Sequence, residues 1–151
     1  MVFIKGNTPS LKNGKVMGKF HPKTVTKYLR SLNIQTYSAS KKEVKGYKDP
    51  NRPNLFRQYI GDYFADRKYP ILVGTHFIRR TRQRFDIINA QQIIFDLLTA
   101  HGYIEDDNAK FIIPVTFRIN GNDYSIDKEN PGTWIKIFKG EWDLYDIRMV
   151  N

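Results

Sequence analysis

Hydrophobic residues recur at intervals of three and four in three segments, which predicts amphipathic helices. The clearest covers residues 87–101 and is followed by Gly102, a suitable residue to end a helix. A second covers residues 55–66 with Asn54 as its N-cap, and a shorter one covers residues 24–32. The apolar face of the helix predicted over residues 87–101 consists of Ile87, Ala90, Ile94, Leu97, Leu98 and His101.

Segments rich in β-forming residues alternate with these helices. They are residues 2–4, 71–78, 111–119 and 133–138. Pro114 predicts an edge strand or a bulge, because proline donates no ladder hydrogen bond, and Asn120-Gly121 is a hairpin signal. The pattern favours the α+β class, with a small mixed sheet packed against two or three helices in a single domain over residues 1–151.

Charge is distributed unevenly along the chain. Residues 1–82 contain 18 Lys and Arg against 4 Asp and Glu, whereas residues 83–151 contain 7 against 11. A net charge of +10 is typical of a protein that binds a polyanion, although a basic surface can also serve solubility alone. Much of the positive charge lies in two predicted loops, residues 6–23 and 36–53.

Candidate DNA-binding side chains occur in the first loop and directly before the clearest helix. Phosphate contacts are expected from Lys12, Lys15, Lys19, Lys23, Arg79, Arg80, Arg82 and Arg84. The aromatic residues Phe20, Tyr37 and Tyr47 lie among lysines and are candidates for stacking on unpaired bases, with ordinary packing as the alternative.

Composition excludes some kinds of site. The chain has no cysteine, so disulfides and thiolate metal sites are absent, and three scattered histidines argue against a zinc centre. No apolar run approaches the roughly 18 residues of a membrane span, and the first residues lack a secretory pattern. We therefore expect a cytoplasmic protein with no membrane partner.

Acidic residues gather at both ends of the clearest helix. Asp86 precedes it, and Asp106 and Asp107 follow it, while Asn89, Gln92 and Asp96 form a polar stripe along one side. Carboxylates beside a basic surface are what metal-assisted phosphodiester cleavage requires. The two ends are about 20–25 Å apart by helical rise, so they can share an ion only if the turn folds back or a second subunit contributes. Asp86 can equally be a simple N-cap, and the acidic turn can be merely solvated.

Residues 82–110 resemble the signature region of the RusA-like Holliday junction resolvases, which are often phage-encoded. That family shows an Arg-rich lead, an Asp-x-Asp-Asn segment that opens a helix, an Asp-x-Leu, a Gly at the helix end and then Asp-Asp. The opening around Thr8-Pro9-Ser10 resembles the family's N-terminal Pro-Ser-x-x-Asn loop. The residues that match the signature without a gap are Asp86, Asn89, Asp96, Leu98, Gly102, Asp106 and Asp107.

The resemblance implies an α+β homodimer that cleaves four-way DNA junctions with Mg²⁺, or with Mn²⁺ in its place. A phage-encoded member would act in the host cytoplasm. The family's metal ligands correspond to Asp86, Ile88 and Asp107, and the place of its helical lysine is taken by Gln92. Ile88 cannot bind a metal and Gln92 carries no charge. The hypothesis is that Asn89 or Asp106 replaces the missing ligand, so that Asp86, Asp106 and Asp107 hold the ion and Asn89 and Gln92 assist.

Two alternatives remain open at this point. In one, catalysis has been lost and the protein only binds branched DNA. In the other, the chain is an unrelated basic module that binds RNA or protein.

Overall fold

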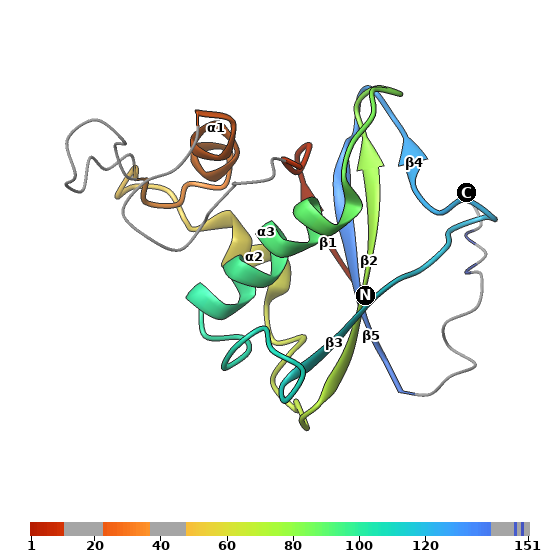
Figure 1. The fold of residues 1–151 in the computed structure, drawn as a ribbon. Coiled ribbons are helices and arrows are strands. Elements are labelled where there is room, and N and C mark those ends of the chain that lie inside the picture. The colour runs from red at the N-terminus through yellow and green to blue at the C-terminus, as the bar shows by residue number, and fades with distance from the viewer. Residues whose placement is uncertain (11–22, 37–47, 140–146, 148, 150–151) are drawn as a thin grey trace.

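The fold is α+β, with a mixed five-stranded sheet and helices against one of its faces (Figure 1). A computed structural model of the protein describes residues 1–10, 23–36, 48–139, 147 and 149. Within these residues, no helix has the length and apolar character needed to cross a membrane. The elements are β1 Val2–Lys5, α1 Lys23–Ser31, α2 Leu55–Ile60, β2 Ile71–Arg79, α3 Ile87–Ala100, β3 Ile112–Thr116, β4 Ser125–Ile126 and β5 Gly132–Phe138.

β2 is the central strand of the sheet. Along one edge it pairs antiparallel with β5, which in turn pairs antiparallel with β1. Along its other edge it pairs parallel first with β3 and then with β4. The parallel β2–β3 pair is connected by α3, so β2, α3 and β3 form a βαβ unit. The predicted mixed sheet is therefore confirmed, and β3 has the edge position that Pro114 predicted.

The helix-facing core lies between α3 and the odd-numbered side chains of β2. Ile94, Leu97 and Leu98 are fully buried there, and burying such side chains contributes roughly 1.5–3 kcal/mol each. Gln91 is a buried polar residue of this layer, and its Nε2 donates to Thr75 Oγ1, which is also buried, and to the Val115 carbonyl, both at 2.9 Å. These bonds connect the helix to both parallel strands.

A smaller core covers the opposite face of the sheet. Phe117, Ile119 and Phe138 form it. Gly74 on β2 leaves room for these rings, since a Cβ there would come within 2.8 Å of Phe117 Cδ1. The sheet is thus covered on both faces, by helices on one side and by an aromatic cluster on the other.

Two predicted elements are shorter than expected. α2 ends at Ile60 instead of residue 66, because Gly61 takes a positive φ of 55° and the chain continues in turns. β3 ends at Thr116, so the predicted strand over residues 111–119 was too long. Asn120 and Gly121 do form a tight turn, with φ of 52° and 81°, but only one isolated antiparallel bridge, Ile119–Asn122, closes it.

Two histidines have ring nitrogens that tie distant elements together. His101 Nδ1 donates to the Leu97 carbonyl at 2.8 Å, so Nε2 accepts from Asn54 Nδ2 at 2.9 Å at the start of α2. His76 on β2 is fully buried and bonds to the Phe117 carbonyl at 2.9 Å and to Ser125 Oγ at 2.7 Å. Burial lowers the pKa of both imidazoles below the ordinary value.

The free energy of unfolding should therefore fall as the pH drops below about 6.5. Well above that value both histidines are neutral in the folded and in the unfolded state. Below it the unfolded chain binds protons first, and each unit of difference between folded and unfolded pKa removes about 1.4 kcal/mol. Urea unfolding at pH 7.5, 6.5 and 5.5 measures the free energy of unfolding at each pH. We expect His101→Asn to make that free energy depend less steeply on pH. Equal stability at all three pH values would contradict it.

Candidate metal and nucleic-acid site

Asp86 immediately precedes α3; its backbone is extended and its Oδ1 accepts the Asn89 backbone N–H at 3.1 Å. This is an N-cap, the simpler of the two expected roles for Asp86. The second carboxylate oxygen has no partner among the described residues. Ile88, in the first turn, is 75% exposed, so the side chain at this expected ligand position faces solvent.

The chain reverses direction sharply after α3. Gly102 has a φ of 77°, its N–H donates to the Thr99 carbonyl at 3.1 Å, and the Tyr103 N–H donates to the Leu98 carbonyl at 2.9 Å. This pair of bonds is the Schellman arrangement that glycine favours at a helix end. Ile104 then buries its side chain in the core, which holds the following acidic turn against the helix.

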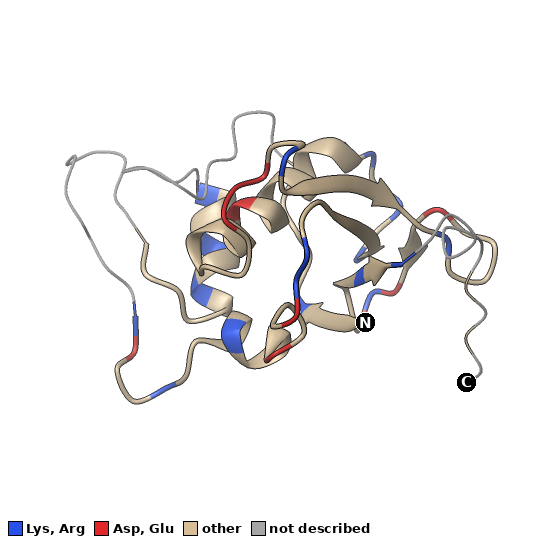
Figure 2. Ribbon diagram, turned by 90° about the horizontal axis from the view of Figure 1, so that it is seen from below, with Lys and Arg blue, Asp and Glu red and all other residues tan. Residues whose placement is uncertain are grey.

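The acidic turn therefore folds back onto the middle of α3. Gln92 Nε2 donates to Asp107 Oδ2 at 2.5 Å and to Asp96 Oδ1 at 2.7 Å. Because both oxygens bond to one nitrogen, they are no more than about 5 Å apart. Figure 2 shows the acidic turn crossing α3 beside the acidic position on the helix. One subunit thus brings Asp107 to the polar stripe without help from a second.

The carboxylates of the turn face different ways. Asp106 accepts within its own turn, from the Asp107 backbone N–H at 2.8 Å and from Asn108 Nδ2 at 3.0 Å. The first of these bonds lowers the pKa of the Asp106 carboxyl. Asp107 is half-buried against the helix instead. Asp96 is the acidic partner that the sequence did not single out as a ligand, although the polar stripe of Asn89, Gln92 and Asp96 already placed it on this face.

The start of the first basic loop lies against the beginning of α3. Asn89 Nδ2 donates to the Ser10 carbonyl at 3.4 Å, and Asn7 Oδ1 accepts the Arg80 backbone N–H at 3.1 Å. Asn89 therefore connects the helix to the N-terminal segment, and among the described residues it has no hydrogen bond to Asp96 or Asp107. The loop residues Lys12, Lys15 and Lys19 lie outside the described residues, as do Phe20, Tyr37 and Tyr47.

Among the predicted phosphate contacts within the described residues, Lys23, Arg80, Arg82 and Arg84 are exposed. Arg79 differs, with only 9% of its surface accessible. Its guanidinium donates to the Thr8 carbonyl and lies 4.4 Å from the centre of the Phe85 ring. Arg79 therefore holds the N-terminal segment in place, which is a correction to its expected role in DNA binding.

Comparison with known proteins identifies no relative. No protein-family model matches the chain, and neither a curated protein nor a solved structure matches it. Within the described residues, no group of three or more histidines and carboxylates is arranged to hold a metal ion. The strongest convergence of candidate side chains is the set Gln92, Asp96 and Asp107, hereafter the α3 acidic site.

Replacing Gln92 by Glu tests whether these three side chains meet. The variant brings a third carboxylate into the site and removes the N–H donor, so in EDTA we expect a loss of about 1 kcal/mol, or roughly 2–4 °C in Tm. Mg²⁺ at millimolar concentration should restore the loss, because three carboxylate oxygens suit a hard cation. Gln83→Glu, an exposed position outside the site, is the control. Equal Mg²⁺ responses of the two variants would refute the convergence.

Proposed function

We propose that the protein is a Mg²⁺-dependent, structure-selective endodeoxyribonuclease that cuts Holliday junctions or other branched DNA in recombination or repair. The observation that carries the proposal is the return of the acidic turn onto α3, which joins Asp107 to Gln92 and Asp96. The resemblance of residues 82–110 to the RusA-like resolvases supplies the reaction class. The exposed Arg80, Arg82 and Arg84 lead directly into the same helix.

The α3 acidic site has the donor chemistry that Mg²⁺ requires. Mg²⁺ binds oxygen ligands at about 2.0–2.1 Å, so two carboxylate oxygens within about 5 Å of each other can approach one ion with small side-chain movements. Rotation of the Gln92 amide by half a turn would present its carbonyl oxygen in place of its N–H. Asp96 and Asp107 would then hold the ion with Gln92 as a neutral third ligand. Mg²⁺ supplies Lewis acidity toward the phosphate and a more acidic bound water.

Asp86 is a further ligand in the family pattern, and the group that would serve is its second oxygen, which has no partner within the part of the chain that the structure describes. Asp86 lies about 9 Å from Gln92 along the helix axis by helical rise. Asn89 positions the N-terminal segment at Ser10, within the first basic loop. In this proposal the chain contributes carboxylates for the ion, arginines for the phosphates and Asn89 as a positioning residue.

Dimerisation forms part of the same proposal. A two-fold dimer would place two α3 acidic sites on a four-way junction, which itself has approximate two-fold symmetry, and so would cut two strands. Sedimentation of the free protein and of its junction complex measures how many subunits each contains.

A second candidate function is binding of branched DNA without cleavage. The exposed Ile88 favours it, because this residue occupies the position of a metal ligand in the family pattern. Incubation with four-way junction, duplex and single-stranded DNA, in Mg²⁺ or EDTA, separates the candidates. Paired nicks near the crossover in Mg²⁺ support the nuclease, tight binding without nicks supports the second candidate, and no preference for branched DNA excludes both.

Asp107→Asn should lower the rate of junction cleavage by about 100-fold or more while junction affinity in EDTA changes little. Loss of an outer-sphere partner of a metal commonly costs 10–100-fold, and loss of a direct ligand costs more. Asp66→Asn, an exposed carboxylate on the turn after α2, is the matched control and should cleave at the parental rate. A folded Asp107→Asn protein with parental cleavage would reject Asp107 as a ligand.

Simultaneous replacement of Arg80, Arg82 and Arg84 by Gln should flatten the salt dependence of junction binding. Each lost phosphate contact reduces the slope of log K against log salt by about 0.9, so three contacts reduce it by nearly 3. The control changes Arg67 and Lys68, an exposed basic pair before β2, to Gln. Anisotropy titrations between 50 and 300 mM NaCl, a range chosen around physiological ionic strength, measure both. Identical slopes for the two variants would contradict the assignment.

A further inference from the structure

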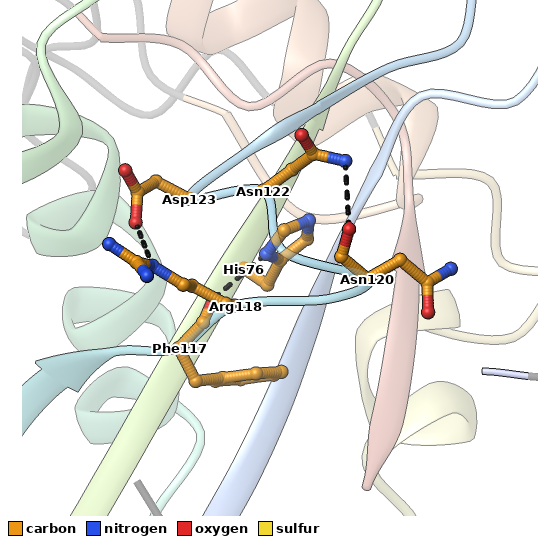
Figure 3. A network of polar contacts seen from close by, with 6 residues as sticks. All are labelled: His76, Phe117, Arg118, Asn120, Asn122 and Asp123. Carbon is orange, nitrogen blue, oxygen red and sulfur yellow. Dashed lines mark hydrogen bonds and ion pairs between the residues drawn. The ribbon is translucent and has the colours of Figure 1, made fainter. Parts of the chain in front are cut away.

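The loop between β3 and β4 is fixed at both ends by one buried side chain. His76, on the central strand, bonds to the Phe117 carbonyl at the start of the loop and to Ser125 Oγ at its end. Figure 3 shows His76 beneath the loop and bonded to Phe117. Because β2 is itself paired on both edges, the loop is attached to the most constrained part of the fold.

The interior of the loop is also ordered by local bonds. Ile119 and Asn122 exchange two backbone hydrogen bonds of 3.1 Å across the Asn120-Gly121 turn. Arg118 Nε bonds to Asp123 Oδ1 at 2.9 Å, as Figure 3 shows. The side chains on the loop are therefore presented from a backbone with few alternatives, which reduces the entropy lost when they bind a ligand.

Tyr124 is the aromatic side chain that this loop presents. It is 40% exposed, and its ring centre lies 5.0 Å from that of Phe85 at an angle of 78°. Phe85 is supported in turn by the Arg79 guanidinium at 4.4 Å from its ring centre and by Phe77 at 6.2 Å. Tyr124 therefore has an aromatic neighbour that is itself supported, and it stays exposed enough to contact a ligand.

Tyr124 is one of the residues that line a pocket of about 400 Å³. It combines an aromatic ring, a guanidinium and short polar side chains, the groups that recognise a nucleotide. An aromatic ring stacks on a base, a guanidinium pairs with phosphate, and amide or carboxylate groups bond to base edges. The lining residues are Arg82, Gly121, Asn122, Asp123, Tyr124 and Ile126.

We infer that this pocket, the Tyr124 pocket, receives a single unstacked base of the DNA, with Tyr124 as the stacking surface and Arg82 on the adjacent phosphate. The inference rests on the proposed function, because it takes DNA to be the substrate. It identifies an unstacked base as the feature of a branch point that the protein recognises. Branched DNA offers unstacked bases at its crossover, whereas an intact duplex does not. The site therefore supplies a physical cause for a preference for branches over duplex.

Charge favours a nucleic acid over a protein as the occupant. Arg82 lines the pocket, and the exposed Arg80 and Arg84 flank it in the chain, within a protein of net charge +10. The carboxylate in the lining, that of Asp123, bonds to Arg118 at 2.9 Å, which partly offsets its repulsion toward a phosphate.

The test is a binding titration in EDTA, where no cleavage occurs, with four-way junction, single-stranded and duplex DNA. Tyr124→Leu keeps an apolar group against Phe85 but removes the aromatic face, and Tyr124→Phe keeps the face. Loss of one base stack corresponds to roughly 5- to 150-fold in affinity. We expect a loss in that range for Tyr124→Leu on junction and single strands, parental affinity on duplex, and a change of less than about twofold for Tyr124→Phe. Ile113→Ala, an exposed apolar residue on β3, is the matched control and should bind as the parent does.

A second readout locates the base. Junctions carrying 2-aminopurine at the crossover should show a fluorescence change on binding the parent and Tyr124→Phe, but not on binding Tyr124→Leu. Parental affinity of Tyr124→Leu for branched DNA would overturn the inference and leave the nuclease proposal intact. Equal loss on duplex, or a change in oligomeric state without a change in DNA binding, would also overturn it. Failure of the parent itself to bind any of the three DNAs would overturn both proposals.

Discussion

β2 is hydrogen-bonded along both edges and buried on both faces, and this double constraint fixes the positions of both candidate sites. Its odd-numbered side chains hold α3, from which Gln92 and Asp96 project. Its even-numbered side chains include His76, which fixes the loop carrying Tyr124. The strand ends at Arg79, whose side chain turns inward to Thr8 and Phe85. The exposed arginines follow at once, so the basic segment begins where the most rigid strand ends.

The α3 acidic site depends on a helix end as much as on the helix. Gly102 takes the left-handed conformation, Ile104 is buried, and the chain is thereby turned back so that Asp107 reaches the middle of α3. A neutral amide between two carboxylates keeps them close in the absence of a cation, because its N–H₂ group donates to both. The same amide offers an oxygen when rotated, so in the proposed metal site one side chain would serve with and without an ion.

The sequence predicted the elements whose pattern is strong and local. Residues 71–78 and 87–101 gave strand and helix nearly as found, because long apolar periodicity outweighs other preferences. The end of α2 was missed, because the apolar spacing continues to Phe64 and outweighed the local helix-end signal of Gly61. Asp107 was predicted as a candidate, but its meeting with Gln92 and Asp96 depends on the burial of Ile104, a long-range event. Arg79 was predicted as a phosphate contact, because sequence alone does not distinguish a buried arginine from its exposed neighbours.

Pro114 in the middle of β3 has a consequence for how copies of the chain behave at high concentration. β3 is the short outer strand of the sheet, and within the described residues no strand pairs with its outer side. A proline in this edge strand removes one backbone N–H donor. A strand from another copy therefore cannot form an unbroken ladder of hydrogen bonds with β3, and growth into cross-β aggregates is disfavoured. Electrostatic repulsion gives similar protection while the net charge is +10, but a polyanion that neutralises the surface abolishes it. The protection from Pro114 is independent of charge and persists under those conditions.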